Sequence, residues 1–150
     1  MKTIGFKKLD PLATIPTYAH NDKTNAGLDF YSLHEYTLYP GATAILETGI
    51  AWDGMALVTD SEKPVLVVKS RSGNAFNHSV ECTNAGIIDA NYTGQIKVKL
   101  YNHGENLAVI HKGDRIAQGI VYMLPILEPT EVFELTETVR GANGFGSTGR

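Results

Sequence analysis

The sequence predicts an all-β protein that folds as a barrel or a sandwich, and three observations lead to this class. Short runs of β-branched and aliphatic residues follow one another along the chain. Glycine, proline, aspartate or asparagine separates these runs at intervals of roughly 8–12 residues, the spacing typical of sandwiches and barrels. Only residues 73–79 are compatible with a helix, so the pattern does not favour a fold of alternating strands and helices.

The clearest strand is residues 95–101. Ile96, Val98 and Leu100 occupy alternate positions, with Lys97 and Lys99 between them. This two-residue period indicates a strand with one buried and one exposed face. Four further strands are predicted at residues 55–59, 65–69, 107–110 and 115–123. Turns are predicted at residues 40–41, 53–54, 102–104 and 112–114.

The composition predicts one soluble domain with a substantial core. The chain has 150 residues, of which 43% are hydrophobic and 19% charged. The net charge of −3 argues against the broad basic surface that nucleic acids and membranes attract, so we expect neither partner.

Nothing in the sequence predicts a membrane or secretory segment. The longest uncharged apolar stretch, residues 116–127, is interrupted by Pro125 and is shorter than the ~20 residues of a membrane span. Residues 1–10 lack an apolar signal-peptide core, and the single Cys82 cannot form an intrachain disulfide. We therefore expect a cytoplasmic protein, or a nuclear one if the source is eukaryotic or viral.

The last residues differ in composition from the rest. Residues 140–150 hold four of the fifteen glycines and one large apolar side chain, Phe145. Such a segment is expected to be flexible, so we predict a β-domain over residues 1–139 and a mobile arm over 140–150. An aromatic ring can stack on a base, while Arg140, Ser147 and Thr148 suit phosphates.

The triplet Arg71-Ser72-Gly73 follows a predicted strand. It offers a guanidinium, a hydroxyl and backbone amides without a covering Cβ, which are groups that a triphosphate binds. An ordinary polar turn is the alternative.

The segment 86–94 places Asp89 beside Ile88 and three residues before Tyr92, between two glycines. A carboxylate in that position can deprotonate a water, although it can equally cap its own turn. Further along, Asp114 and Arg115 are expected to form a structural ion pair, and only Gln118 in that region suggests a ligand. The five histidines lack metal-ligand spacing, and no phosphate-binding P-loop motif is present.

Taken in chain order, these segments resemble the five-motif pattern of the homotrimeric dUTP pyrophosphatases (dUTPases). The segments are residues 26–30, 71–73, 86–94, 113–118 and 140–149. Phe30, Ser70 and Asn91 stand where the family usually has leucine, proline and an acidic residue. The connection 52–63 is longer than usual and is expected to form a hairpin insert.

The resemblance implies a jelly-roll-like β-fold, cleavage of dUTP to dUMP and pyrophosphate with Mg²⁺, and a homotrimer with sites between subunits. It implies that Asp89 activates water, that Tyr92 packs on the deoxyribose, and that Phe145 stacks on uracil. Asp29 would lie near the metal, through a water. The remaining contacts with dUTP fall to Arg71, Ser72, Gly73, Asn84, Gly86, Ile87, Ile88, Lys97, Gln118, Arg140, Gly146, Ser147 and Thr148.

Two other functions are compatible with these motifs. One is a relative of the same fold that acts on dCTP, whose deamination would need a glutamate beside Tyr92 that the sequence lacks. The other is a regulatory protein that binds the nucleotide without turning it over.

Overall fold

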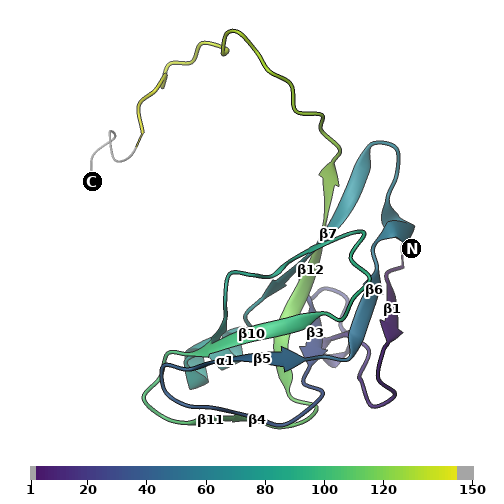
Figure 1. Cartoon of the computed structure of the whole chain (residues 1–150), viewed down its shortest axis with the longest axis vertical. Helices are drawn as coiled ribbons and strands as arrows, with labels where there is room; N and C mark the ends of the chain where they lie inside the picture. Colours follow the sequence, from purple (N-terminus) through teal and green to yellow (C-terminus); the bar gives the residue numbers. More distant parts are fainter. Residues whose placement is uncertain (1–2, 145–150) are drawn as a thin grey trace.

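Short strands make up most of the regular secondary structure in residues 3–144, which are the residues described by the computed structural model of the chain (Figure 1). The elements are β1 (Gly5–Lys8), β2 (Thr17–Tyr18), the 3₁₀ turn η1 (Ala19–Asn21), β3 (Leu28–Tyr31), β4 (Tyr36–Leu38), β5 (Thr43–Glu47), β6 (Ile50–Asp53), the 3₁₀ turn η2 (Met55–Leu57), β7 (Glu62–Lys69), α1 (Ser72–His78), β8 (Val80–Cys82), β9 (Ile87–Asp89), β10 (Lys97–Asn102), β11 (Ala108–Ile110) and β12 (Arg115–Pro125). The predicted all-β class is confirmed.

The strand β12 organises the larger sheet, whose order is β2-β3-β12-β7-β9. It pairs antiparallel with β7 from Gln118↔Lys69 to Pro125↔Glu62, and its first half pairs with β3. A second sheet has the order β5-β10-β8, and the pairs β1-β6 and β4-β11 complete the body. Residues from these sheets share one core, as expected for a jelly-roll-like fold.

The core contains the apolar faces of the strands. In β10, Val98 and Leu100 are buried whereas Lys97 and Lys99 are exposed, so the predicted alternation is confirmed. The largest fully buried apolar side chains include Phe30, Leu38, Leu46, Ile50, Leu66, Ile96 and Ile116. Burying side chains of this size contributes about 1.5–3 kcal/mol each, and this packing fixes the strands that carry the site residues.

The predicted strand at residues 55–59 is wrong. Met55–Leu57 forms a 3₁₀ turn instead, in which the amide of Leu57 donates to the carbonyl oxygen of Gly54 (3.1 Å). The chain leaves β6 at Gly54, where a Cβ would collide with Ala90 and the ring of Trp52. The expected hairpin insert is thus a 3₁₀ turn followed by a tight turn, in which the amide of Thr59 donates to the carbonyl oxygen of Glu62 (2.9 Å).

The single predicted helix is confirmed as α1. It directly follows Arg71, which has extended backbone angles, and it ends at His78, before Ser79, whose left-handed φ is 54°. In the described residues no helix is long and apolar enough to cross a membrane.

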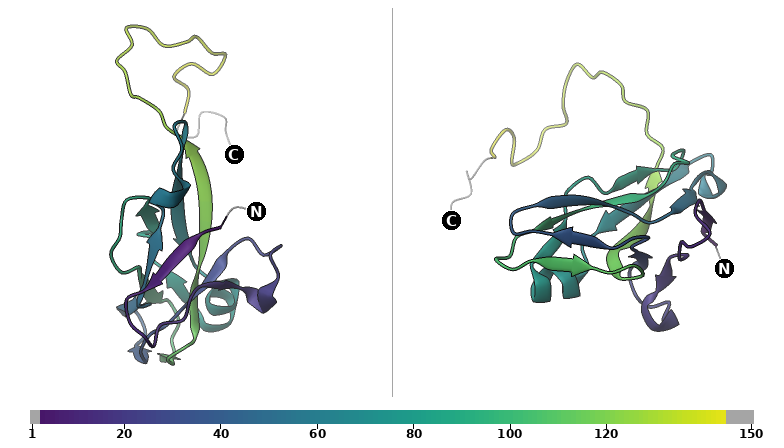
Figure 2. Two further views of the ribbon diagram at one scale, coloured as in Figure 1. Left: turned by 90° about the vertical axis from the view of Figure 1, so that its right-hand side faces the viewer. Right: turned by 60° about the horizontal axis from the view of Figure 1, so that its bottom comes forward.

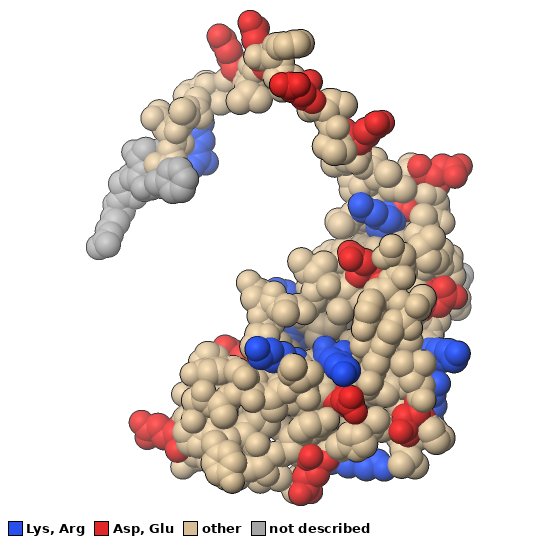
Figure 3. Space-filling view, in the orientation of Figure 1, with Lys and Arg blue, Asp and Glu red and all other residues tan. Residues whose placement is uncertain are grey.

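The chain leaves the body after β12 (Figures 1 and 2). From residue 126 to 143 every residue is exposed, including Phe133 and Val139. Acidic side chains lie along this segment (Figure 3), which contains glutamates at positions 128, 131, 134 and 137. Its apolar side chains therefore add nothing to the core of the same chain.

Candidate active site

Two arginines meet one buried carboxylate at the end of β7. Asp29, on β3, is only 5% exposed. The Nε atom of Arg71 donates to its Oδ1 at 2.7 Å, and an Nη atom of Arg115 lies 3.5 Å from its Oδ2. That Oδ2 atom has no hydrogen-bond partner. The carboxylate therefore brings two guanidinium groups together, and such groups bind phosphate oxygens strongly.

The groups next to Arg71 leave backbone and side-chain donors accessible. A Cβ on Gly73 would meet no atom within 4 Å, so the backbone there is open to a ligand. Gln118 lies beside this turn, because its Nε2 donates to the carbonyl oxygen of Ser70 (2.9 Å). Five of the predicted site residues therefore lie in one region: Arg71, Ser72, Gly73, Gln118 and Asp29.

A hollow of about 790 Å³ adjoins this region. Arg71 and Arg115 line one part of it, and Asn74, His78 and His103 line another. We call Arg71, Ser72, Gly73, Arg115 and Gln118 the phosphate cradle. It has the positive charge and the donors that an anionic chain requires.

A second, smaller hollow lies at β9 and contains the predicted base. Its volume is about 260 Å³, and its lining residues are Ile87, Ile88, Asp89, Tyr92, Gln95 and Lys97. We call it the Asp89 hollow. It combines two isoleucines and an aromatic ring with one carboxylate and one ammonium. This mixture is suited to a nucleobase and a sugar beside a reacting water.

Hydrogen bonds fix the turn that follows Asp89. The amide of Tyr92 and the indole Nε1 of Trp52 both donate to the carbonyl oxygen of Asp89, at 3.1 and 3.2 Å. The hydroxyl of Tyr92 donates to the carbonyl oxygen of Gln95 at 2.9 Å. The Tyr92 ring is therefore held at the hollow, with 44% of the residue exposed in the single chain.

The loop before β9 passes directly along β7. The amide of Val68 donates to the carbonyl oxygen of Gly86 at 2.6 Å, and a Cβ on Gly86 would collide with the carbonyl group of Val68. Only glycine permits this approach. Asn84, two residues earlier, is exposed.

The Asp89 hollow and the phosphate cradle are separate in one chain. The two hollows share no lining residue. Asp89 pairs with Val65 on β7, whereas Arg71 comes six residues later in the sequence. At a rise of about 3.3 Å per residue, this corresponds to roughly 20 Å along the strand direction.

Of the predicted site residues in the arm, only Arg140 lies within the described part of the chain. Arg140 is exposed, and its Nε donates to the carbonyl oxygen of Asn143 at 2.8 Å within a local turn. Phe145, Gly146, Ser147 and Thr148 lie outside the described residues.

Burial raises the pKa of Cys82 to about 11, so its thiol is protonated and weakly nucleophilic at neutral pH. Among residues 3–144, no group of three or more histidines, cysteines, aspartates and glutamates could hold a metal ion.

Comparisons with known proteins identify the family to which the chain belongs. The dUTPase family model matches residues 13–149. The chain belongs to the dUTPase family. The deoxyuridine 5'-triphosphate nucleotidohydrolase of Clostridioides difficile is 41% identical over 150 residues, covering 99% of each chain. That of Wolinella succinogenes is 42% identical over 148 residues, covering 98% of this chain and 94% of the relative.

A solved dUTPase also shares the fold along the whole chain. The Staphylococcus bacteriophage 80alpha dUTPase with dUpNHpp superposes with a TM-score of 0.81 and 27% identity, and the match covers 100% of both chains. The jelly-roll-like dUTPase fold predicted from the motifs is confirmed by this match.

Sequence reasoning missed two residues that line the two hollows. Arg115 was expected to pair with Asp114, but it pairs with Asp29, while an oxygen of Asp114 accepts from the amide of His111 (2.8 Å). Gln95 lines the Asp89 hollow without any distinctive local signal. The Gly-Asp-Arg turn before β12 was the one available hint for Arg115.

Proposed function

We propose that this chain hydrolyses dUTP to dUMP and pyrophosphate, which keeps uracil out of DNA and supplies dUMP for dTMP synthesis. The observation that carries the proposal is the pair of guanidinium groups held by Asp29, together with Asp89 in a hollow lined by both apolar and polar side chains. The names of the bacterial relatives and the dUpNHpp bound to the phage 80alpha dUTPase support dUTP as the substrate.

Asp89 acts as the general base in this proposal. Its carboxylate accepts a proton from a water, and the oxygen of that water attacks the α-phosphorus as the bond to the bridging oxygen of pyrophosphate breaks. Phosphoryl substitution needs this in-line water and charge neutralisation more than it needs covalent help. One positioned carboxylate is therefore sufficient.

The Asp89 hollow selects uracil and deoxyribose. Ile87 and Ile88 supply apolar surface, and backbone groups between Asn84 and Asp89 read the base edge. Tyr92 packs on the sugar, where a ribose 2′-hydroxyl would be left without a partner. The backbone near Gly86 is tied to β7, and in this proposal the fixed loop excludes a thymine methyl.

The phosphate cradle holds the triphosphate. Arg71, Ser72, Gly73 and Gln118 donate to its oxygens, and we add Arg115 to this set because it shares Asp29 with Arg71. Lys97 supplies a further positive charge at the Asp89 hollow. The arm then closes over the nucleotide, with Phe145 on uracil and with Arg140, Gly146, Ser147 and Thr148 on the phosphates.

The residues fit a Mg²⁺ ion that the triphosphate carries. Mg²⁺ prefers phosphate oxygens and waters to a cage built of protein ligands, and the described residues offer no such cage. Asp29 would contribute through a water at Oδ2, the oxygen without a hydrogen-bond partner. When bound, the ion would neutralise phosphate charge.

We propose further that the protein is a homotrimer with its active sites between subunits. Asp89 pairs with Val65 on β7, and Arg71 lies beyond the end of that strand, roughly 20 Å from Val65 in the strand direction. This separation supports a site that combines the Asp89 hollow of one chain with the phosphate cradle of another. The exposed segment 126–143 extends away from its own body, as an arm that reaches a neighbour would. Light scattering should report the mass of three chains, and a fully active monomer at micromolar concentration would contradict the assembly.

Turnover of dUTP, dCTP and dTTP with Mg²⁺, followed by chromatography of the products, tests the activity itself. We expect dUMP and pyrophosphate from dUTP and negligible product from the other two. Deamination of dCTP would favour the related deaminase chemistry. Binding of dUTP without product would favour a regulatory binding protein.

A further inference from the structure

We propose that Glu47 is a positioning residue of the active site, which holds the Lys97 ammonium away from Asp89. The inference rests on the proposed role of Asp89 as the base. Glu47 itself does not line the Asp89 hollow, so it would act through Lys97 alone.

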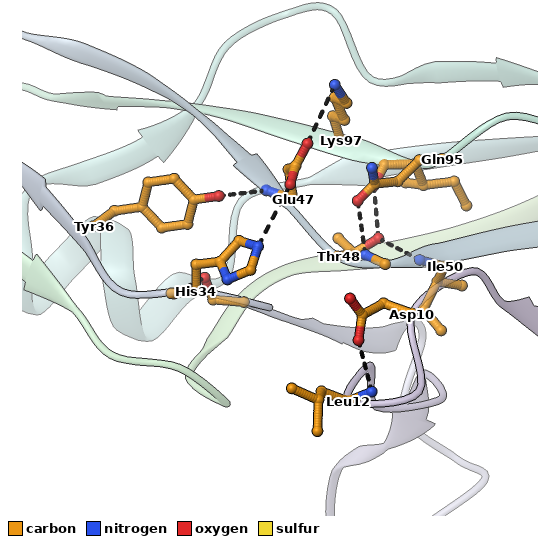
Figure 4. Close-up of polar contacts among 12 residues, drawn as sticks. Asp10, Leu12, His34, Tyr36, Glu47, Thr48, Ile50, Gln95 and Lys97 are labelled. Atoms are coloured by element: carbon orange, nitrogen blue, oxygen red, sulfur yellow. Dashed lines mark hydrogen bonds and ion pairs between the residues drawn. The ribbon is translucent and has the colours of Figure 1, made fainter.

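The sheet register places Glu47 beside Lys97. The two residues are directly paired between β5 and β10, and Lys97 Nζ lies 3.5 Å from Glu47 Oε1 (Figure 4). Two further groups set the position of Glu47. Its amide donates to the hydroxyl of Tyr36 at 3.0 Å, and His34 Nε2 lies 3.6 Å from its Oε2.

The turn after Glu47 is joined to the same hollow by hydrogen bonds. The buried hydroxyl of Thr48 donates to the carbonyl oxygen of Ile96 at 2.6 Å, and the amide of Gly49 donates to Gln95 Oε1 at 2.9 Å (Figure 4). Gln95 lines the hollow and accepts from the hydroxyl of Tyr92. The backbone that carries Glu47 is therefore fixed relative to Asp89 and Tyr92.

The position of the Lys97 ammonium affects the reaction through its charge. Lys97 and Asp89 line one hollow and have opposite charges, so they attract each other. An ammonium close to a carboxylate stabilises its ionised form and makes it a weaker base, which slows proton removal from water. Glu47 offers the ammonium another partner.

The charged and titratable groups around Lys97 come from several elements. Glu47 and His34 lie on the β5 side, Asp89 and Tyr92 on the β9 side, and Lys99 follows on the same face of β10. Both side chains of the Glu47–Lys97 pair are partly exposed, so its effect on the rate should be modest.

Glu47→Gln tests the inference, because it removes the charge and keeps the shape. We expect kcat for dUTP to fall about fivefold with little change in KM, as suits the loss of one partly exposed ion pair. The acidic limb of the pH–kcat profile should move to lower pH. The matched control is Glu81→Gln. Glu81 lies on the neighbouring strand β8, outside the Asp89 hollow, and its carboxylate is 3.3 Å from His103. The Glu81→Gln variant should change neither kcat nor the pH–kcat profile.

A double-mutant cycle separates positioning from a structural role. If Glu47 acts through Lys97, Glu47→Gln should have no further effect on kcat in a Lys97→Met background. The melting temperature of the single variant Glu47→Gln should match that of Glu81→Gln. The inference is overturned if Glu47→Gln has normal kcat and a normal pH profile, or if its effect persists without Lys97. Asp89→Asn is assayed in parallel: normal turnover in that variant would reject the proposed base, whereas its inactivity beside a normal Glu47→Gln would reject only the inference about Glu47.

Discussion

The side chain of Arg71 donates through Nε to Oδ1 of Asp29, 2.7 Å away, and this contact joins the start of α1 to β3. Because Nε is the atom engaged, the two Nη groups of the guanidinium remain available to other acceptors. Asp29 thus sets the orientation of Arg71 before any nucleotide binds.

Replacing Asp29 should weaken both stability and substrate binding. Asp29→Asn leaves two guanidinium groups close together without their shared counter-charge, and breaking a largely buried pair costs about 1–3 kcal/mol or more. We expect a lower melting temperature and a KM for dUTP raised by roughly tenfold, equivalent to about 1.4 kcal/mol. Asp60→Asn, at an exposed turn, serves as the control in both assays. An unchanged KM would mean that Asp29 does not orient Arg71.

Replacing Asp89 should affect chemistry rather than binding. Asp89→Asn keeps the shape of the side chain but cannot accept the proton, so kcat should fall by at least ~10²-fold. Affinity for the non-hydrolysable analogue dUpNHpp, measured by calorimetry, should stay within about tenfold. Normal turnover would eliminate Asp89 as the base.

Tyr92 should control the choice of sugar. We expect dUTP to be strongly preferred over UTP, because an unpaired ribose hydroxyl costs roughly 1–3 kcal/mol. Tyr92→Ala should erode the ratio of the two kcat/KM values. Tyr92→Phe loses only the hydrogen bond to Gln95 and should keep the preference. Equal use of UTP and dUTP by the unaltered protein would contradict the proposed sugar contact.

The arm should matter for catalysis and not for folding. Deleting residues 140–150 should leave the melting temperature without ligand nearly unchanged, because the described part of that segment contacts little else. It should lower kcat/KM by at least ~10²-fold, about 2.7 kcal/mol of transition-state stabilisation. Phe145→Ala should reproduce part of this loss, roughly the 1–3 kcal/mol of one base–aromatic stack.

Deletion of only Gly149 and Arg150 is the control for the arm, since it keeps every proposed arm contact. Normal activity of the longer deletion, or its failure to fold, would exclude a catalytic lid. Circular dichroism and steady-state kinetics on the same preparations distinguish these outcomes.

The fold was predictable where short-range pattern decides it. The alternation around Val98 and Leu100 indicated both the strand and its buried face, and α1 was predicted because residues 73–79 were the only segment compatible with a helix. The run at 55–59 misled, because an uninterrupted apolar run has no period that separates a strand from a turn. Its conformation depends on contacts of Gly54 with Trp52 and Ala90, which no local pattern reveals.

The site was predictable as a set of segments and not as a set of contacts. The motifs selected Arg71 and Gln118, which do lie together beside Asp29. The partner of Arg115 could not be predicted, since adjacent Asp114 was the obvious candidate and the actual partner comes from a distant strand. The pairing of Glu47 with Lys97 likewise depends on the register of β5 against β10.

The separation of Asp89 from Arg71 along β7 has a genetic consequence on the proposed assembly. Two inactive alleles, one altered at each residue, would encode chains that are defective at different halves of a site. Mixed trimers would then contain some sites built entirely from undamaged halves, so the alleles would complement each other when expressed together. An inactive chain can thus still complete the active site of its neighbour.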